Sequence, residues 1–281
     1  MPLDTSTYSL ALLRVDGRRW NELRRCHAQV RTQAAADGSS YWEMGNTKVM
    51  CVLTGPSEPG PKRAGTVSAG GGTTGSGNET TAEVVVNIVV AGFSSVDRRR
   101  RGRTDKRIQE LSATVARTLA GVLHTHLFPR SAITFSLHVL SQDGSLLAAL
   151  LNAATLAAVD AGIPMTDYVV ACSAGSTSSD ASADTTDGAD PLLDLNLQEE
   201  QELPSLTVAT LGATDRVAAL VSESRVQAQR LEGMLAVAVD GCKQVRAIVD
   251  RVVREAGLKI VQEGNSSAAD ADQVSSMEID V

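Results

Sequence analysis

Residues 141–165, SQDGSLLAALLNAATLAAVDAGIPM, are the stretch from which the fold can be predicted. The spacing of the apolar side chains predicts a helix over residues 145–161, directly after a tight turn at Asp143-Gly144. Residues 132–140 before the turn alternate between apolar and polar side chains, as in a half-buried strand. The free N–H groups at the start of such a helix commonly bind an anion, so this turn is a candidate anion site.

Strand and helix patterns continue on both sides of this stretch. Apolar and β-branched runs predict strands at 26–30, 39–56, 82–93, 168–174, 206–211 and 217–222, and helical periodicity predicts helices at 108–123 and 231–256. Hydrophobic residues make up 43% of the 281 residues and aromatic residues only 3%, so the core is expected to be aliphatic. The sequence therefore predicts a fold of the α/β (α+β) class.

The charges are unevenly distributed along the chain. The net charge is −7, but residues 180–202 hold eight acidic residues and residues 262–281 hold five, with no Lys or Arg in either segment. Without these thirteen acids the remainder carries a net charge of +6. A basic body of this kind favours a polyanionic partner.

Composition also excludes several classes of protein. No apolar run is long enough for a membrane span, and the first seven residues lack the pattern of a secretory signal, so we expect no membrane association.

The four cysteines are far apart, and Cys51 and Cys172 lie in apolar segments where burial is expected. We therefore predict no metal site and no cofactor.

Low-complexity segments set the expected domain boundaries. We predict one domain over residues 12–261, with mobile insertions at about 64–81 and 175–190 that are rich in Gly, Ser, Thr and Asp. Residues 262–281 are expected to form a disordered acidic tail.

Basic residues gather where the strand at 82–93 leads into the helix at 108–123. The cluster consists of Arg98, Arg99, Arg100, Arg101, Arg103, Lys106 and Arg107, and Lys62-Arg63 forms a smaller one. Because a helix N-terminus also attracts phosphate, the larger cluster is suited to a phosphate-bearing partner. A targeting signal or a patch that only aids solubility remains an alternative for the larger cluster.

Several motifs together resemble the RNase PH family of phosphate-dependent exoribonucleases. The motifs, in chain order, are Arg14-Val15-Asp16-Gly17-Arg18, Ala36-Asp37-Gly38-Ser39-Ser40-Tyr41, Gly45-Asn46-Thr47-Lys48-Val49, Thr54-Gly55-Pro56, Pro129-Arg130, Gln142-Asp143-Gly144, Leu151-Asn152-Ala153-Ala154-Thr155-Leu156-Ala157, Asp160-Ala161-Gly162-Ile163-Pro164-Met165 and Pro191-Leu192-Leu193-Asp194-Leu195-Asn196. Within the family, the match is to the eukaryotic exosome ring subunit that corresponds to the catalytic subunit of the archaeal exosome.

The resemblance implies a fold of two similar sheet-and-helix halves. It implies a heterodimer with another RNase PH-like subunit within a six-membered ring, RNA-binding cap subunits, an associated hydrolytic nuclease, and single-stranded RNA threaded through a central pore. Lys62 and Arg63 match a loop that faces the pore entrance in this family, so the resemblance implies that both basic clusters contact the RNA backbone. It also implies roles in rRNA processing and mRNA decay, in the nucleus and nucleolus and in the cytoplasm.

The chemistry of the family depends on residues that this chain has changed. Active relatives bind phosphate with a Thr/Ser-Arg pair after the Asp-Gly turn, where Leu146 and Leu147 stand here. In their carboxylate stretch the last aspartate is replaced here by Glu200, and a later aspartate falls at about Leu206. Apolar side chains do not compensate a buried anion. We therefore predict a non-catalytic ring subunit that is not an enzyme.

The alternative is an active phosphate-dependent 3′-to-5′ exoribonuclease. It would use Arg103, Arg107 and Glu200, completed by a neighbouring subunit. A third alternative is a structural interaction protein that makes no contact with RNA.

Overall fold

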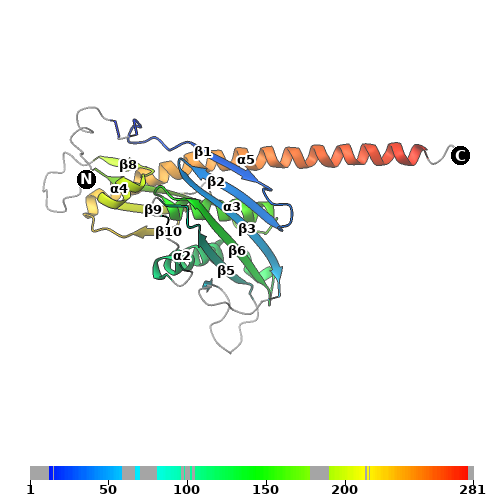
Figure 1. The fold of residues 1–281 in the computed structure, drawn as a ribbon, viewed down its shortest axis with the longest axis horizontal. Coiled ribbons are helices and arrows are strands. Elements are labelled where there is room, and N and C mark those ends of the chain that lie inside the picture. Colours follow the sequence, from blue (N-terminus) through cyan, green and yellow to red (C-terminus); the bar gives the residue numbers. More distant parts are fainter. Residues whose placement is uncertain are drawn as a thin grey trace.

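The structure is a computed structural model in which two sheets enclose a central helix (Figure 1). It describes residues 13–14, 16–58, 67–69, 81–95, 98, 102, 105–177, 190–212, 214 and 216–277. No helix in these ranges is both long and apolar enough to cross a membrane.

The first sheet has six strands in the order β1-β2-β3-β6-β5-β4. The strands are β1 (Cys26–Val30), β2 (Gly38–Met44), β3 (Thr47–Ser57), β4 (Val67–Ala69), β5 (Glu83–Val90) and β6 (Ala132–Ser141). Only β5 and β6 pair in parallel, and the chain between them includes helix α2 (Lys106–Val122) and the short 3₁₀ helix η1 (Thr125–Leu127). Side chains of β5 alternate between buried and half-buried, which is the pattern the sequence predicted for a strand with one face in the core.

The second sheet has four antiparallel strands in the order β10-β9-β7-β8. They are β7 (Val169–Ser176), β8 (Pro191–Leu193), β9 (Ser205–Leu211) and β10 (Val217–Ser222), with the short helix α4 (Leu197–Glu202) before β9. Helix α5 (Ala228–Met277) packs on β7, β8 and β9 and then projects away from the sheets (Figure 1).

Helix α3 (Leu146–Asp160) joins the two halves, because it packs on β2 and β3 of the first sheet and on β7 of the second. It is buried almost all round, and its small residues allow this close approach. The side chain of Asn152 bonds the backbone N–H and C=O of Ala171 in β7, at 2.8 and 2.9 Å. Strand β8 pairs only with Ala174–Ser176 of β7. The side chain of Asn152 therefore bonds backbone groups of β7 beyond the end of β8.

The fold class and the two sheet-and-helix halves are confirmed. The structure also confirms the helix after the Asp143-Gly144 turn, the hairpin of β9 and β10, and the burial of Cys51 and Cys172. The single domain over 12–261 stays a prediction.

The low-complexity segments differ in part from the prediction. β4 pairs with β5 inside the first predicted insertion, while residues 70–80 and 178–189 of the two insertions lie outside the described residues. Helix α5 continues to Met277, where the sequence predicted disorder from residue 262. This segment contains no proline, and extending an existing helix requires no new nucleation, which explains the difference.

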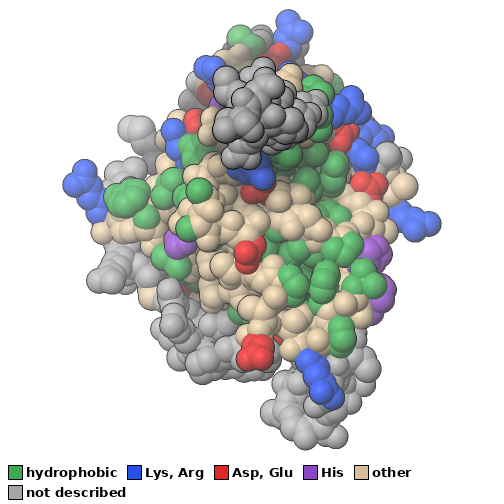
Figure 2. Space-filling model, turned by 90° about the vertical axis from the view of Figure 1, so that its right-hand side faces the viewer, with side chains coloured by type: hydrophobic (Ala, Val, Ile, Leu, Met, Phe, Trp, Pro, Cys, Tyr) green, Lys and Arg blue, Asp and Glu red, His purple; other side chains and the backbone are tan. Residues whose placement is uncertain are grey.

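One face of the molecule exposes apolar side chains near the projecting end of α5. Figure 2, viewed from the side to which α5 points, shows hydrophobic side chains gathered below the helix and basic side chains mostly around the edge. On the helix itself, Leu258 is 63% exposed and Val261 is 59% exposed. A contiguous group of exposed apolar side chains is a feature of surfaces that contact other proteins.

Candidate active site

The candidate site begins at the turn before α3. Gly144 has φ +74° and Ser145 has φ +54°, so both adopt the left-handed conformation. A side chain at Gly144 would meet the backbone of residues 195–197, with the Leu195 carbonyl oxygen only 2.5 Å from an added Cβ. Glycine is therefore required here, because the turn presses directly on the chain that leads into α4.

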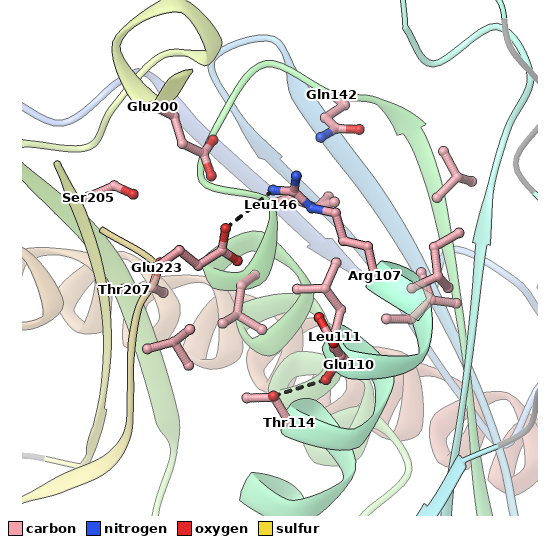
Figure 3. A pocket seen from close by; sticks show the side chains of 15 residues that line it. Arg107, Glu110, Leu111, Thr114, Gln142, Leu146, Glu200, Ser205, Thr207 and Glu223 are labelled. Atoms are coloured by element: carbon pink, nitrogen blue, oxygen red, sulfur yellow. Dashed lines mark hydrogen bonds and ion pairs between the residues drawn. The ribbon is translucent and has the colours of Figure 1, made fainter. Parts of the chain in front are cut away.

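A pocket of about 220 Å³ opens beside this turn, between the two halves of the molecule (Figure 3). Its apolar wall comes from β5, α2, α3 and β10 and includes Ile88, Ile108, Leu111, Leu146, Leu147 and Val221. Its polar side chains converge from α2, β6, α4, β9 and the end of β10, and include Arg107, Gln142, Glu200, Ser205, Thr207 and Glu223. A concave pocket with convergent polar groups is the usual form of a ligand site.

Glu200 is the pocket carboxyl group that contacts the α3 turn. The backbone N–H of Ser145 donates to Oε2 of Glu200 at 3.1 Å. Burial raises the pKa of Glu200 above its ordinary value, and the neighbouring Glu223 carboxylate adds to the rise. The Ser145 N–H and the charges of Arg107 and Arg24 oppose it. A carboxyl with a raised pKa keeps its proton to higher pH and is suited to donating that proton.

Arg107 supplies the positive charge of the pocket. It lies in the first turn of α2, where its own N–H donates to the capping carboxylate of Asp105 at 3.3 Å. Its guanidinium reaches over the pocket toward Glu223, with Nη2 and Oε2 3.8 Å apart (Figure 3). The Arg107 side chain is 61% exposed, so it is held weakly and is free to meet an incoming anion.

The structure thus brings together four residues that the sequence singled out: Leu146, Leu147, Arg107 and Glu200 all line the pocket. Leu206 does not join them, because its side chain is fully buried against Val208, Met234 and Ala238 beneath the second sheet. The assignment of Leu206 to the position of a lost aspartate therefore stays a prediction, for a residue that does not line the pocket. Side chains alternate along β9, so its neighbours Ser205 and Thr207 face the pocket instead.

The predicted RNA contacts are only partly described. Arg98 and Lys106 are exposed, and neither lines the pocket. Lys62, Arg63, Arg99, Arg100, Arg101 and Arg103 lie outside the described residues. Among the described residues, no group of three or more His, Cys, Asp or Glu side chains is placed to hold a metal ion.

Behind the pocket, a buried charge network joins the N-terminal segment to the loop before α4. Asp194 is fully buried and accepts from Arg24 through Nη2 at 2.7 Å and Nε at 2.9 Å. Burial alone would raise the pKa of Asp194, but the charge and hydrogen bonds of Arg24 hold it below its ordinary value. The network therefore keeps an ionised carboxylate inside the protein.

Arg14 makes a parallel connection in the same network. Its guanidinium pairs with the buried carboxylate of Glu199 and donates to the backbone oxygen of Asp194 at 2.9 Å. The structure thus buries Arg14 and Arg24 in ion pairs with Glu199 and Asp194. Only the motifs around Arg14 and Asp194, which belong to the family pattern, pointed to their importance.

Two family models match the chain, and together they cover most of it. The model described as "3' exoribonuclease family, domain 1" (RNase_PH) matches residues 22–164, and "3' exoribonuclease family, domain 2" (RNase_PH_C) matches residues 167–241. The pocket and the α3 turn lie where these two parts meet. The chain belongs to the RNase PH family.

The individual relatives that match the chain are components of exosome complexes. The chain is 37% identical over 247 residues to the exosome complex component ski6 of Schizosaccharomyces pombe, a match that covers 88% of this chain and 93% of that protein. It is 38% identical to the exosome complex component RRP41 homolog of Arabidopsis thaliana, over 86% of this chain and 92% of that protein.

Solved structures show the same fold. Rice Rrp46 matches with a TM-score of 0.69 at 23% identity, covering 86% of this chain and all of that one. A chain of the Archaeoglobus fulgidus exosome, with RNA bound to its active site, matches with a TM-score of 0.65 at 20% identity and covers 86% and 95% of the two chains.

These matches correct one prediction. The sequence indicated that the chain is not an enzyme, and this is overturned by its match to both domains of an exoribonuclease family and to exosome components named ski6 and RRP41. The prediction gave too much weight to Leu146 and Leu147. The pocket that they line still contains a guanidinium and a carboxyl group.

Proposed function

We propose that the chain is a core subunit of an exosome and that its pocket removes nucleotides from RNA 3′ ends with phosphate. The observation that carries the proposal is that Arg107 and Glu200 both line one pocket at the junction of the two exoribonuclease domains. An anion-binding cation and a carboxyl with a raised pKa are the two groups that phosphorolysis needs most.

Arg107 is the group that binds the attacking phosphate. Its guanidinium offers paired N–H donors that fit the oxygens of a phosphate. The first turn of α3 adds backbone N–H groups that have no partner within the helix and favour an anion. Leu146 and Leu147 add no donors, so we expect a further cation from the neighbouring ring subunit.

Glu200 is the group that protonates the leaving oxygen. A phosphate oxygen attacks the phosphorus of the last phosphodiester, the bond from phosphorus to the 3′ oxygen breaks, and neutral Glu200 gives its proton to that oxygen. The products are a nucleoside 5′-diphosphate and an RNA that is one nucleotide shorter with a free 3′ hydroxyl. The phosphate later restores the proton to Glu200.

The test measures nucleoside diphosphates released from single-stranded RNA in phosphate and Mg²⁺ buffer. The chain is assayed alone and assembled with an RNase PH-like ring partner that carries no activity by itself. We expect phosphate-dependent release in the assembly, reduced at least about 100-fold by Arg107→Ala or Glu200→Gln.

Two matched variants control for changes unrelated to the pocket. Arg117→Ala removes an exposed arginine from the same helix as Arg107, and Glu202→Gln changes an exposed carboxyl in the same helix as Glu200. Both are expected to keep full release. No diphosphate from the wild-type assembly, or release that survives Glu200→Gln, contradicts the catalytic proposal.

Assembly and RNA threading are part of the same proposal. Exposed apolar residues such as Phe93, Leu127 and Leu258 support contacts with other subunits, and exposed Arg98 and Lys106 support contact with RNA backbone. The native mass of the complex purified with the tagged chain tests the assembly, and a homohexamer of this chain alone contradicts it. Cap subunits, an attached hydrolytic nuclease, and nuclear, nucleolar and cytoplasmic localisation stay predictions.

A further inference from the structure

Two residues that are not glycine share an unusual backbone conformation behind the pocket. Ser145 has φ +54° and Asp194 has φ +53°, although they lie 49 positions apart in the chain. The left-handed conformation is strained for such residues, so surrounding contacts must hold it in place. Asp194 and Ser145 also contact each other, since the Ser145 hydroxyl lies 3.1 Å from Oδ1 of Asp194.

Arg24 holds the Asp194 end of this contact. Besides its two side-chain bonds, its backbone N–H donates to Oδ2 of Asp194 at 3.0 Å. The Arg24 guanidinium also donates to the backbone oxygen of Asp143, two residues before Ser145. One buried arginine from the N-terminal segment therefore fixes both the carboxylate and the turn that precedes α3.

The Ser145 hydroxyl is enclosed by several acceptors. It is 3.0 Å from the Leu195 carbonyl oxygen and bonds the hydroxyl of Ser173, and the Ser145 residue is only 2% exposed. While these contacts hold the side chain, the backbone N–H of Ser145 donates to Glu200.

Among the described residues, three charged groups act on Glu200: Arg107 from α2, Glu223 after β10, and Arg24 behind the turn. Of the groups around Glu200, Ser145 is the one whose hydrogen bond to it depends on a strained backbone conformation.

We propose that Ser145 is a positioning residue, locked by the Asp194–Arg24 pair so that its N–H holds Glu200 in place over the pocket. The alignment of Glu200 is a property of the free protein. The inference therefore rests on the proposed function only where it concerns the effect of this alignment on catalysis. Alanine at position 145 loses the hydroxyl contacts and is strained at positive φ, so the turn relaxes and the N–H leaves Glu200.

The experiment is an NMR titration of the full chain carrying ¹³C-labelled glutamate, with Glu200 assigned by Glu200→Gln. Ser145→Ala is expected to raise the pKa of Glu200 by about half a unit to one unit, because a hydrogen bond to the charged form is lost. Ser112→Ala is the matched control: it removes a buried serine hydroxyl from α2 that bonds only the Ile108 carbonyl, and it should leave this pKa unchanged.

Activity gives a second readout. If the assembly is active, the decline of kcat at high pH should move upward in Ser145→Ala by the same amount as the Glu200 pKa, with KM for RNA unchanged. An unshifted Glu200 pKa in folded Ser145→Ala, or an equal shift in Ser112→Ala, overturns the inference. A shift in a chain that shows no phosphorolysis supports the positioning role and contradicts only the proposed reaction.

Discussion

The pocket rim and the charge network behind it use the same kinds of side chain in opposite ways. At the rim, Arg107 and Glu223 are 61% and 68% exposed and their charged atoms are 3.8 Å apart. In the network, Arg24 and Asp194 are 5% and 0% exposed and approach to 2.7 Å. A buried pair must be fully bonded, whereas a loosely paired exposed charge can exchange its partner for a ligand. The buried network therefore supports the fold, whereas the rim is available for chemistry.

The largest expected effect is on the network. Asp194→Asn leaves Arg24 buried without its ion partner, and breaking such a pair costs about 3–5 kcal/mol. We expect a fall of that size in the free energy of unfolding, measured by urea denaturation. Glu223→Gln, which breaks the exposed pair, is the comparison variant. If both variants lose equal stability, the distinction between rim and network fails.

Lowering the pH is also expected to destabilise the protein through the charge network. The pKa of Asp194 is lower in the folded protein than in the unfolded chain, so its contribution to stability is present above the unfolded pKa of about 3.9. That contribution is lost as pH falls through the still lower folded pKa. Urea midpoints between about pH 5 and pH 2 should decline more steeply in the wild type than in Asp194→Asn. Parallel curves would mean that Asp194 is not the acid-sensitive group.

A smaller loss is expected where the turn presses on the network. Gly144→Ala combines positive φ with a clash against the Leu195 carbonyl, and should cost more than about 1 kcal/mol. Gly162 also has positive φ, +68°, but no atom lies within 4 Å of an added Cβ there. Gly162→Ala therefore measures the strain alone. Equal unfolding midpoints for the two variants would show that the contact with residues 195–197 does not matter.

The smallest effect on stability is expected at the rim itself. Glu223→Gln removes one partner of an exposed pair and should change the free energy of unfolding by no more than about 1 kcal/mol. The same change lowers the pKa of Glu200, because the nearby negative charge is lost. The NMR titration of Glu200 should record a downward shift. A large loss of stability without any shift would place Glu223 in the structural network.

Local pattern determined much of this protein. The alternation at 132–140, the turn at Asp143-Gly144 and the periodicity of 145–161 predicted β6 and α3 to within one residue at each end. These patterns depend on neighbours a few positions apart, so they can be seen in the sequence. The motifs around them also indicated the family, and Arg107 and Glu200 as candidate site residues.

Only the tertiary structure decided which residues share a site. Arg24 and Asp194 are 170 positions apart in the chain, yet they form a buried ion pair. The alternation of side chains along β9 decided that Ser205 and Thr207, rather than Leu206, face the pocket. Glu223 reached the pocket from the end of β10, and no local pattern marked it. The physical reason is that burial and pairing of charges depend on how distant segments pack. A sequence motif at 141–165 therefore specified a turn and a helix, and packing against residues 194–200 made that turn part of a site.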